Sequence, residues 1–436
     1  MEMSISQTKK TSVLNEHDLE ITQEEIKQKH EVVVQGMIRS IAQRWRDLSG
    51  QDDWKDLLDP LDIDLRRYII HYGQMAQATY DTFNAEKVSK YAGASRYSKM
   101  NLFSRVGIEI SNPYKYKATR YLYATSQVEM PKSFLVKSLN DNAWCKDSNW
   151  IGYVAVATDG GREALGRRDI LVAWRGTIQN NEWSANFDFP LVSASEIIDD
   201  AKAQVHRGWL SIYTSNNPES LYSKTSAREQ ALSEVRRLLD EFQDEEISIT
   251  VTGHSLGAAL GMLNAADLVY SGLNKPRKKR PQNKCLVTAF LFACPRVGDS
   301  NFKQALSSVS NLHILRTRNN PDIIPLFPMI AGYTEIGIEL DIDTRKSNYL
   351  KYPGNLSIWH NMEVHLHGVA GTQGPKGDFN LVVKRDISLM NKATDSLKDE
   401  FLVPVSWWCV KNKGMIQQAD GTWQLEDHEK DVEIET

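Results

Sequence analysis

The chain has 436 residues, which fits one large α/β domain with additions better than an average single domain. Hydrophobic residues make up 41% and charged residues 25%, and the formal net charge is −4. This composition is typical of a globular protein and argues against nucleic acid as a partner, because such proteins carry a basic surface. The four cysteines lie far apart and match neither a disulfide framework nor a Cys/His metal site, so we expect a reduced, cytoplasmic protein.

The first 30 residues contain no hydrophobic signal-peptide core and no cleavage-site pattern, and their acidic residues are unlike a transit peptide. No stretch of the sequence approaches the roughly 18 apolar residues that a membrane-spanning helix needs. We therefore expect no secretion and no membrane span. A lipid substrate would be reached by transient contact with a membrane surface.

Three segments are predicted in chain order: a flexible and partly helical extension at residues 1–40, a main domain at 41–425 and an acidic, disordered tail at 426–436. In the main domain, residues 62–80 have the apolar periodicity of an amphipathic helix. Two apolar strands at 150–158 and 167–177 flank the sequence Asp-Gly-Gly, which predicts a hairpin with a tight turn.

The second half of the main domain alternates between helical and strand patterns. Residues 226–245 read as a helix, and later strands are expected within 247–252, 285–298 and 312–325. Strands that alternate with helices predict an α/β fold with a mostly parallel sheet covered by helices.

The sequence Gly253-His254-Ser255-Leu256-Gly257 lies between the strand pattern 247–252 and a helical pattern at 258–270. A strand before and a helix after distinguish a nucleophile elbow from a chance match to Gly-x-Ser-x-Gly. We therefore predict that Ser255 is a catalytic nucleophile. The N–H of Leu256, at the start of the helix, is expected to stabilise an oxyanion.

A serine nucleophile needs an acid and then a base later in the chain. Asp322 follows a predicted strand within an Asn-Pro turn and is the favoured acid. His360 lies where a loop meets a helix and is the favoured base, whereas His365 and His367 fall inside that helix and are interpreted as packed or surface histidines. Thr177, at the end of the strand 167–177, is the candidate for the second oxyanion donor.

Several long motifs stand in one order along the chain: "RWRDLSG", "YIIHYGQMAQATYDTFN", "GRRDILVAWRGT", "TGHSLGAALG", "PRVGD", "RNNPDIIP" and "HGVAGTQG". With these motifs the chain resembles plant class 3 lipases, and among them the cytosolic class II phospholipase A1 group, over roughly residues 45–426. The resemblance implies an α/β-hydrolase fold and a triad of Ser255, Asp322 and His360. It also implies release of the sn-1 fatty acid from phospholipids, with mono- and diacylglycerols as further substrates, and no metal or cofactor.

The family's histidine block is H-x-L-E-x-Y-L-H, whereas this chain has "HNMEVHLH". Met362 replaces the leucine and His365 replaces the tyrosine. This second imidazole leaves His365 as an alternative base.

The resemblance also implies a lid in residues 178–196. Trp183, Phe187, Phe189 and Leu191 would cover an acyl groove and turn toward a lipid surface on opening. The alternative is that these side chains are fixed core, because apolar stripes usually pack. A basic run at 275–281 is interpreted as a solvated loop, with contact to anionic headgroups as the alternative.

Three functions remain open at this point. A serine acyl-hydrolase that acts on phospholipid or glycerolipid is favoured. A lipase-like signalling scaffold keeps the same fold without needing catalysis. An acyltransferase uses the same nucleophile with another alcohol as acceptor.

Overall fold

A computed structural model describes residues 36, 38–110, 112–128, 136, 138–139, 143, 147–177, 190–275, 285–408 and 414–431. Its helices are α2 (Ile63–Thr82), α3 (Leu102–Arg105), α4 (Asp159–Leu165), α5 (Arg207–Thr214), α6 (Ala227–Glu241), α7 (Leu256–Tyr270), α8 (Ser300–Ser307), α9 (Leu356–Trp359) and α10 (Met362–Gly371). Short 3₁₀ helices are η2 (Ile324–Leu326), η3 (Thr344–Lys346), η4 (Ile387–Asn391) and η5 (Asp399–Phe401). A further helical stretch covers residues 38–48.

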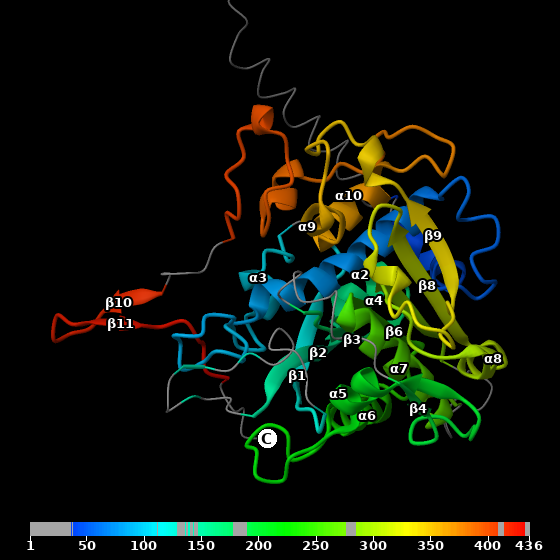
Figure 1. The fold of residues 1–436 in the computed structure, drawn as a ribbon, viewed down its shortest axis with the longest axis horizontal. Helices are drawn as coiled ribbons and strands as arrows, with labels where there is room; N and C mark the ends of the chain where they lie inside the picture. Colours follow the sequence, from blue (N-terminus) through cyan, green and yellow to red (C-terminus); the bar gives the residue numbers. More distant parts are fainter. Residues whose placement is uncertain are drawn as a thin grey trace, which may run out of the picture.

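The strands are β1 (Tyr116–Ala124), β2 (Asn149–Ala157), β3 (Arg168–Trp174), β4 (Leu191–Ser193), β5 (Gln204–His206), β6 (Ile247–His254), β7 (Val287–Phe292), β8 (Leu312–Asn319), β9 (Ile338–Ile342), β10 (Met415–Gln417) and β11 (Trp423–Leu425). The central seven-stranded sheet has the order β1-β2-β3-β6-β7-β8-β9 (Figure 1). The pairs from β3 to β9 are parallel, and β1 and β2 add two antiparallel pairs at one edge. The predicted α/β-hydrolase fold with a mostly parallel sheet is confirmed.

The connection between β2 and β3 differs from the sequence prediction. The two strands pair antiparallel as expected, but they are joined by the helix α4 rather than by a tight Asp-Gly-Gly turn. The hydroxyl of Thr158 accepts a hydrogen bond from the Gly161 N–H and so caps the helix, which ends at Gly166 in the left-handed conformation. The cap and the terminal glycine outweigh the turn propensity of the two glycines.

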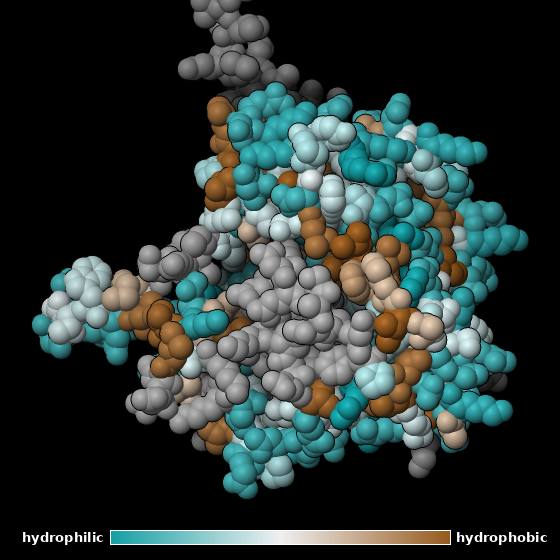
Figure 2. All heavy atoms as spheres, viewed as in Figure 1, coloured by the Kyte–Doolittle hydropathy of each residue, from teal (hydrophilic) through white to brown (hydrophobic). Residues whose placement is uncertain are grey.

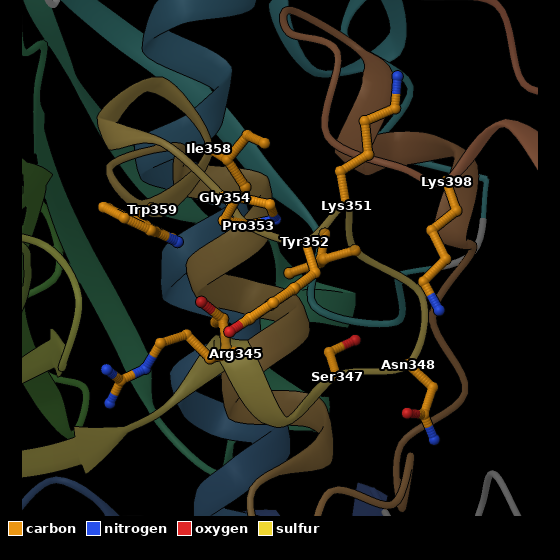
Figure 3. A pocket seen from close by; sticks show the side chains of 12 residues that line it. Arg345, Ser347, Asn348, Lys351, Tyr352, Pro353, Gly354, Ile358, Trp359 and Lys398 are labelled. Carbon is orange, nitrogen blue, oxygen red and sulfur yellow. The ribbon is translucent and has the colours of Figure 1, made fainter.

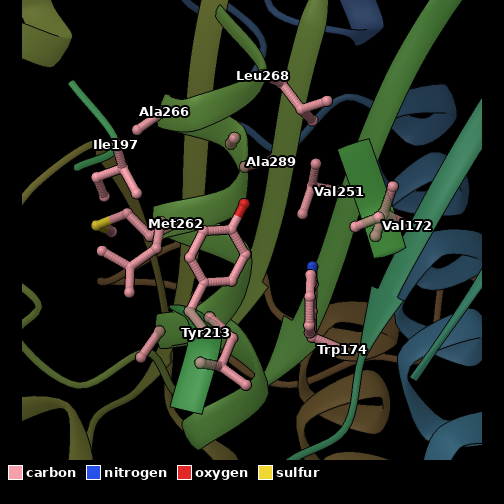
Figure 4. Close-up of a cluster of buried hydrophobic side chains, with 14 of the residues drawn as sticks. Val172, Trp174, Ile197, Tyr213, Val251, Met262, Ala266, Leu268 and Ala289 are labelled. Carbon is pink, nitrogen blue, oxygen red and sulfur yellow. The ribbon is translucent and has the colours of Figure 1, made fainter. Parts of the chain in front are cut away.

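Helices cover both faces of the sheet because successive strand residues point to opposite sides. Leu171 and Ala173 of β3 join a core with α2 and α10, whereas Val172 and Trp174 join a second core with α5, α6 and α7. Figure 4 shows this second core, where Val172 and Val251 of the sheet lie on one side of α7 and Met262 lies on its other side, beside Ile197. This apolar packing holds α7, and therefore its first residues, rigidly against the middle of the sheet.

The acidic tail is ordered where the structure describes it, so the prediction of disorder is wrong for residues 426–431. Glu429 pairs with Arg105 at 2.5 Å, and the ring of His428 stacks on Tyr91 with the ring centroids 4.3 Å apart. Asp427 accepts a hydrogen bond from Asn84 Nδ2 at 3.0 Å. These partners lie more than 300 positions away in the chain, so local composition gave no sign of them. Residues 432–436 lie outside the described part.

Within the described residues, no helix is long and apolar enough to cross a membrane. The extension predicted at residues 1–40 lies outside the description except for positions 36 and 38–40, and these positions are helical.

Candidate active site

Ser255 lies at the sharp turn between β6 and α7. It has φ 61° and ψ −126°, a positive-φ conformation that is rare for a residue with a side chain. The chain can turn this tightly only with glycine on each side. A Cβ on Gly253 would lie 2.3 Å from the Gly257 carbonyl oxygen, and one on Gly257 would lie 2.2 Å from the Trp174 carbonyl oxygen. Backbone strain of this kind marks functional sites and is the geometry expected of a nucleophile elbow.

The structure brings Ser255, Asp322 and His360 together, although 67 and 105 positions separate the later two from the serine. The His360 Nε2 lies 2.9 Å from Ser255 Oγ, and the His360 Nδ1 lies 2.7 Å from Asp322 Oδ2. All three residues are buried. The imidazole therefore bridges the hydroxyl and the carboxylate in the arrangement of a serine-histidine-acid triad.

The backbone around His360 is fixed by hydrogen bonds on both sides. His360 lies between α9 and α10, and the side chain of Asn361 caps α10 by accepting from the Glu363 N–H at 2.8 Å. Asn319, the last residue of β8, donates from Nδ2 to the Trp359 carbonyl at 2.9 Å. The strand that leads to Asp322 therefore also holds the turn that carries the histidine.

Asp322 is held by its own turn as well as by the histidine. Its Oδ1 accepts from the Ile324 N–H at 3.0 Å. Burial alone would raise the pKa of Asp322, but the imidazoles of His360 and His365 outweigh it and hold the pKa below its ordinary value of 3.8. The carboxylate is therefore ionised, and it lies 2.7 Å from His360 Nδ1, the position from which the acid of a triad stabilises an imidazolium.

His365 is buried in α10, as expected of a packed helical histidine, and its ring also contacts Asp322. Its Nε2 lies 3.4 Å from Asp322 Oδ2, at ion-pair distance but without hydrogen-bond geometry. It does not replace His360, because among the described histidines it is His360 whose ring lies within hydrogen-bond distance of Ser255 Oγ. His367 contacts neither group; its Nε2 lies 2.7 Å from Ser347 Oγ.

His254 and Tyr80 form a layer behind the triad that sequence patterns did not reveal. The His254 Nδ1 lies 2.7 Å from the Tyr80 hydroxyl, and its ring centroid lies 4.6 Å from that of His360. Burial lowers the pKa of His254 far below its ordinary value, and the imidazoles of His360 and His365 add to the effect. A neutral His254 therefore packs against the base. The buried face of the 62–80 helix pattern was the only signal for Tyr80.

The two predicted oxyanion donors lie on segments that touch each other. Leu256 is the first residue of α7, so the helix itself provides no acceptor for its N–H. Thr177 follows the end of β3 and is buried, and its hydroxyl has no hydrogen-bond partner among the described residues. Close contact of Gly257 with the carbonyl of Trp174 and the backbone of Arg175 holds the end of β3 against the elbow.

Comparison with known proteins places this geometry in a family. The model described as "Lipase (class 3)" matches residues 171–332. Phospholipase A1-IIgamma of Arabidopsis thaliana is 56% identical over 398 residues, which are 90% of this chain and 94% of the relative. Phospholipase A1-II 1 of Oryza sativa subsp. indica is 52% identical over 395 residues, 90% of this chain and 98% of the relative. The chain belongs to the phospholipase A1-II family of class 3 lipases.

Solved structures of fungal lipases align with a smaller part of the chain. The lipase of Rhizopus microsporus var. chinensis is 21% identical, with a TM-score of 0.40, over 65% of this chain and 76% of that one. The nonglycosylated LIP2 lipase of Yarrowia lipolytica is 16% identical, with a TM-score of 0.42, over 65% and 82%. The class 3 model includes Ser255 and Asp322 but ends before His360.

Parts of the predicted lipase site lie outside the described residues. These are Trp183, Phe187 and Phe189 of the lid, and all of the basic run 275–281 except Lys275. Leu191, the last lid candidate, begins β4 and is partly buried. The lid and headgroup contacts therefore stay predictions.

In the part of the chain that is described, no group of three or more His, Cys, Asp or Glu side chains is arranged to hold a metal ion.

A separate pocket lies behind the turn that carries His360 (Figure 3). Trp359 lines it and directly precedes His360. Three cationic side chains on its wall pair with carboxylates: Arg345 with Asp343, Lys351 with Asp395, and Lys398 with Glu400. None of the three triad residues, Ser255, Asp322 and His360, lines this pocket.

Proposed function

We propose that this protein is a phospholipase A1, a serine esterase that releases the sn-1 fatty acid from phospholipids. The observation that carries the proposal is the continuous contact from Ser255 Oγ through His360 to Asp322, at 2.9 and 2.7 Å. Membership of the phospholipase A1-II family supports the lipid substrate and the acyl position. Mono- and diacylglycerols share the same ester and are proposed as further substrates.

The proposed reaction begins when Ser255 Oγ attacks the ester carbonyl and passes its proton to His360 Nε2. The ionised Asp322 stabilises the resulting imidazolium through Nδ1–H. The negative charge of the tetrahedral intermediate is stabilised by the N–H groups of Leu256 and Thr177. His360 then donates its proton to the leaving lysophospholipid alkoxide. A water molecule, deprotonated by the same histidine, releases the fatty acid from Ser255.

A mixed-chain phosphatidylcholine, with different acyl chains at sn-1 and sn-2, tests the proposal. The wild-type protein should release the sn-1 chain first, and Ser255→Ala should release neither chain while keeping the same thermal unfolding transition. Preferential release of the sn-2 chain would contradict the acyl position. Hydrolysis that survives in Ser255→Ala would contradict the nucleophile.

We infer that the protein makes transient contact with a membrane surface near the triad. Ile323 and Met329, in the loop that carries Asp322, are 44% and 59% exposed. Figure 2 shows apolar surface gathered near the middle of the viewed face, beside the loops that follow β8 in Figure 1. Exposed apolar patches of this kind mark interaction sites.

The proposed lid is tested by Trp183→Ala, with one assay on phospholipid vesicles and one on a short soluble ester. A lid that meets lipid predicts a larger loss on vesicles than on the ester. Equal loss on both substrates would mean that Trp183 is a core residue.

We propose a cytoplasmic location as well. The four cysteines lie far apart in the sequence and match no disulfide framework, and the buried Cys294 forms no disulfide within the described residues, as expected in a reducing compartment. Fractionation of cells that express the tagged full-length chain tests this location, and recovery with the secreted fraction would contradict it.

A further inference from the structure

Arg175 lies between the end of β3 and the oxyanion donor Thr177, and its guanidinium is buried. Its Nε donates to the Trp150 carbonyl at 3.0 Å, and one terminal nitrogen donates to the Gly176 carbonyl at 2.7 Å. The guanidinium also lies over the ring of Phe83, 3.9 Å from its centroid. Burial lowers the pKa of Arg175 to about 10, so the group keeps its positive charge at neutral pH.

The Gly176 carbonyl, which accepts the second of these hydrogen bonds, belongs to the peptide that joins Gly176 to Thr177. The carbonyl of Gly176 and the N–H of Thr177 are the two ends of one planar peptide unit. A cation bound to the carbonyl oxygen draws electron density toward that oxygen, which makes the N–H at the other end a stronger donor. It also fixes the plane of the peptide, and therefore the direction in which the Thr177 N–H points.

The same peptide is confined on its other side. A Cβ added to Gly176 would lie 2.0 Å from the Tyr80 hydroxyl oxygen and 2.5 Å from the His254 carbonyl oxygen. Tyr80 in turn contacts His254 Nδ1. Arg175 and the Tyr80–His254 pair therefore hold the peptide next to the elbow from two directions.

We propose that Arg175 is a positioning residue of the oxyanion hole, whose guanidinium orients and polarises the Gly176–Thr177 peptide toward the tetrahedral intermediate. This inference rests on the proposed function, because it needs Ser255 chemistry with an oxyanion. Oxyanion stabilisation is stronger in the transition state than in the ground state, so Arg175 affects kcat rather than substrate binding.

The test compares two ligands of the full-length protein. A trifluoromethyl ketone analogue adds to Ser255 and places an oxyanion in the hole, whereas a non-hydrolysable diether phosphatidylcholine only occupies the ground-state site. For Arg175→Met we expect about tenfold weaker binding of the ketone and about tenfold lower kcat. Binding of the diether lipid and KM should change less than about twofold, since the substrate itself carries no oxyanion.

A matched control is Arg66→Met. Arg66 is also a buried arginine, and it donates to backbone carbonyls, those of Val369 and Thr372 near the end of α10. The Arg66→Met substitution should lower thermal stability without changing the ratio of the affinities for the ketone and the diether lipid. If Arg175→Met gives no folded protein, Arg175→Lys decides the question, with a severalfold loss of ketone affinity expected at unchanged diether affinity.

In a folded Arg175 variant, an equal loss of affinity for both ligands, or unchanged affinity for the ketone, would overturn the inference. Failure of the proposed function is recognised separately and beforehand. In that case the wild-type protein releases no fatty acid, or Ser255→Ala still does.

Discussion

Two carboxylates are buried in the central sheet, at opposite ends of its strands, and their surroundings differ sharply. Asp169 lies near the start of β3 and accepts four hydroxyl hydrogen bonds, from Tyr72, Tyr116, Ser248 and Thr250 at 2.5–2.9 Å. Arg167 lies 3.5 Å away. Both oxygens of Asp169 are fully used, and the cluster ties α2 and the edge strand β1 to the inner strands β3 and β6.

Asp322, beyond the other end of the strands, lies among groups whose hydrogen-bonding capacity is not used. His365 has no hydrogen bond at either ring nitrogen, and neither His254 Nε2 nor the Thr177 hydroxyl has a partner in the described part of the chain. Unpaired buried polar atoms cost stability. The comparison teaches that the carboxylate at one end of the sheet is fully hydrogen-bonded, whereas the carboxylate at the other end has buried neighbours whose polar atoms are unpaired among the described residues.

The largest expected effect separates the two histidines near Asp322. His360→Ala should lower kcat by about 10⁴-fold, because it removes the imidazole that lies within hydrogen-bond distance of Ser255 Oγ. His365→Ala should cost less than about tenfold, since its contact with Asp322 is longer. Steady-state hydrolysis of phosphatidylcholine checks both variants. Full loss only in His365→Ala would reverse the assignment of the base.

The second expected effect concerns stability at the other end of the sheet. Asp169→Asn should lower the free energy of unfolding by about 3 kcal/mol, because Arg167 keeps a buried charge without its carboxylate. Urea denaturation measures the loss. The rate per folded molecule should stay within about twofold, and a fall in kcat comparable to that of His360→Ala would show that the two clusters are not separate.

A third effect depends on pH. The pKa of Asp322 is lower in the folded protein than its ordinary value of 3.8. Its ionised form therefore contributes stability that is present above pH 3.8 and is lost as the pH falls toward the folded-state pKa. The difference in unfolding free energy between wild type and Asp322→Asn should shrink below about pH 4. A difference that stays constant or widens in acid would contradict this account.

The smallest effect is expected at the surface, where Glu429 pairs with Arg105 at the end of α3. Glu429→Gln weakens the partly exposed pair with Arg105 and should cost less than about 1 kcal/mol of unfolding free energy. Arg105→Gln is the matched variant from the other side of the pair. Loss of several kcal/mol in either would mean that the tail contributes far more to stability than a surface ion pair does.

Local patterns were enough to predict the elbow. The strand, the two glycines and the helix around Ser255 are contiguous, and glycine is required there by close backbone contacts. Asp322 and His360 followed from their order in the chain and their positions at element ends. The sheet also followed, because apolar strands alternating with helices can bury their faces in few ways.

The remaining features depend on packing between distant segments. The contact of His365 with Asp322 arises only where α10 lies against β8, and the contact of Tyr80 with His254 joins positions 174 residues apart. The Asp169 cluster combines side chains from α2, β1, β3 and β6. Periodicity marked these residues as buried but not as partners.

The most direct test of the central claim is to trap the acyl-enzyme. The protein is mixed with a slowly hydrolysed phospholipid, quenched in acid, and mapped by peptide mass spectrometry. We predict one acyl group of the sn-1 chain on the peptide that contains Ser255, and none in Ser255→Ala or His360→Ala. Acylation at another residue, or fatty-acid release by Ser255→Ala at the wild-type rate, would contradict the account.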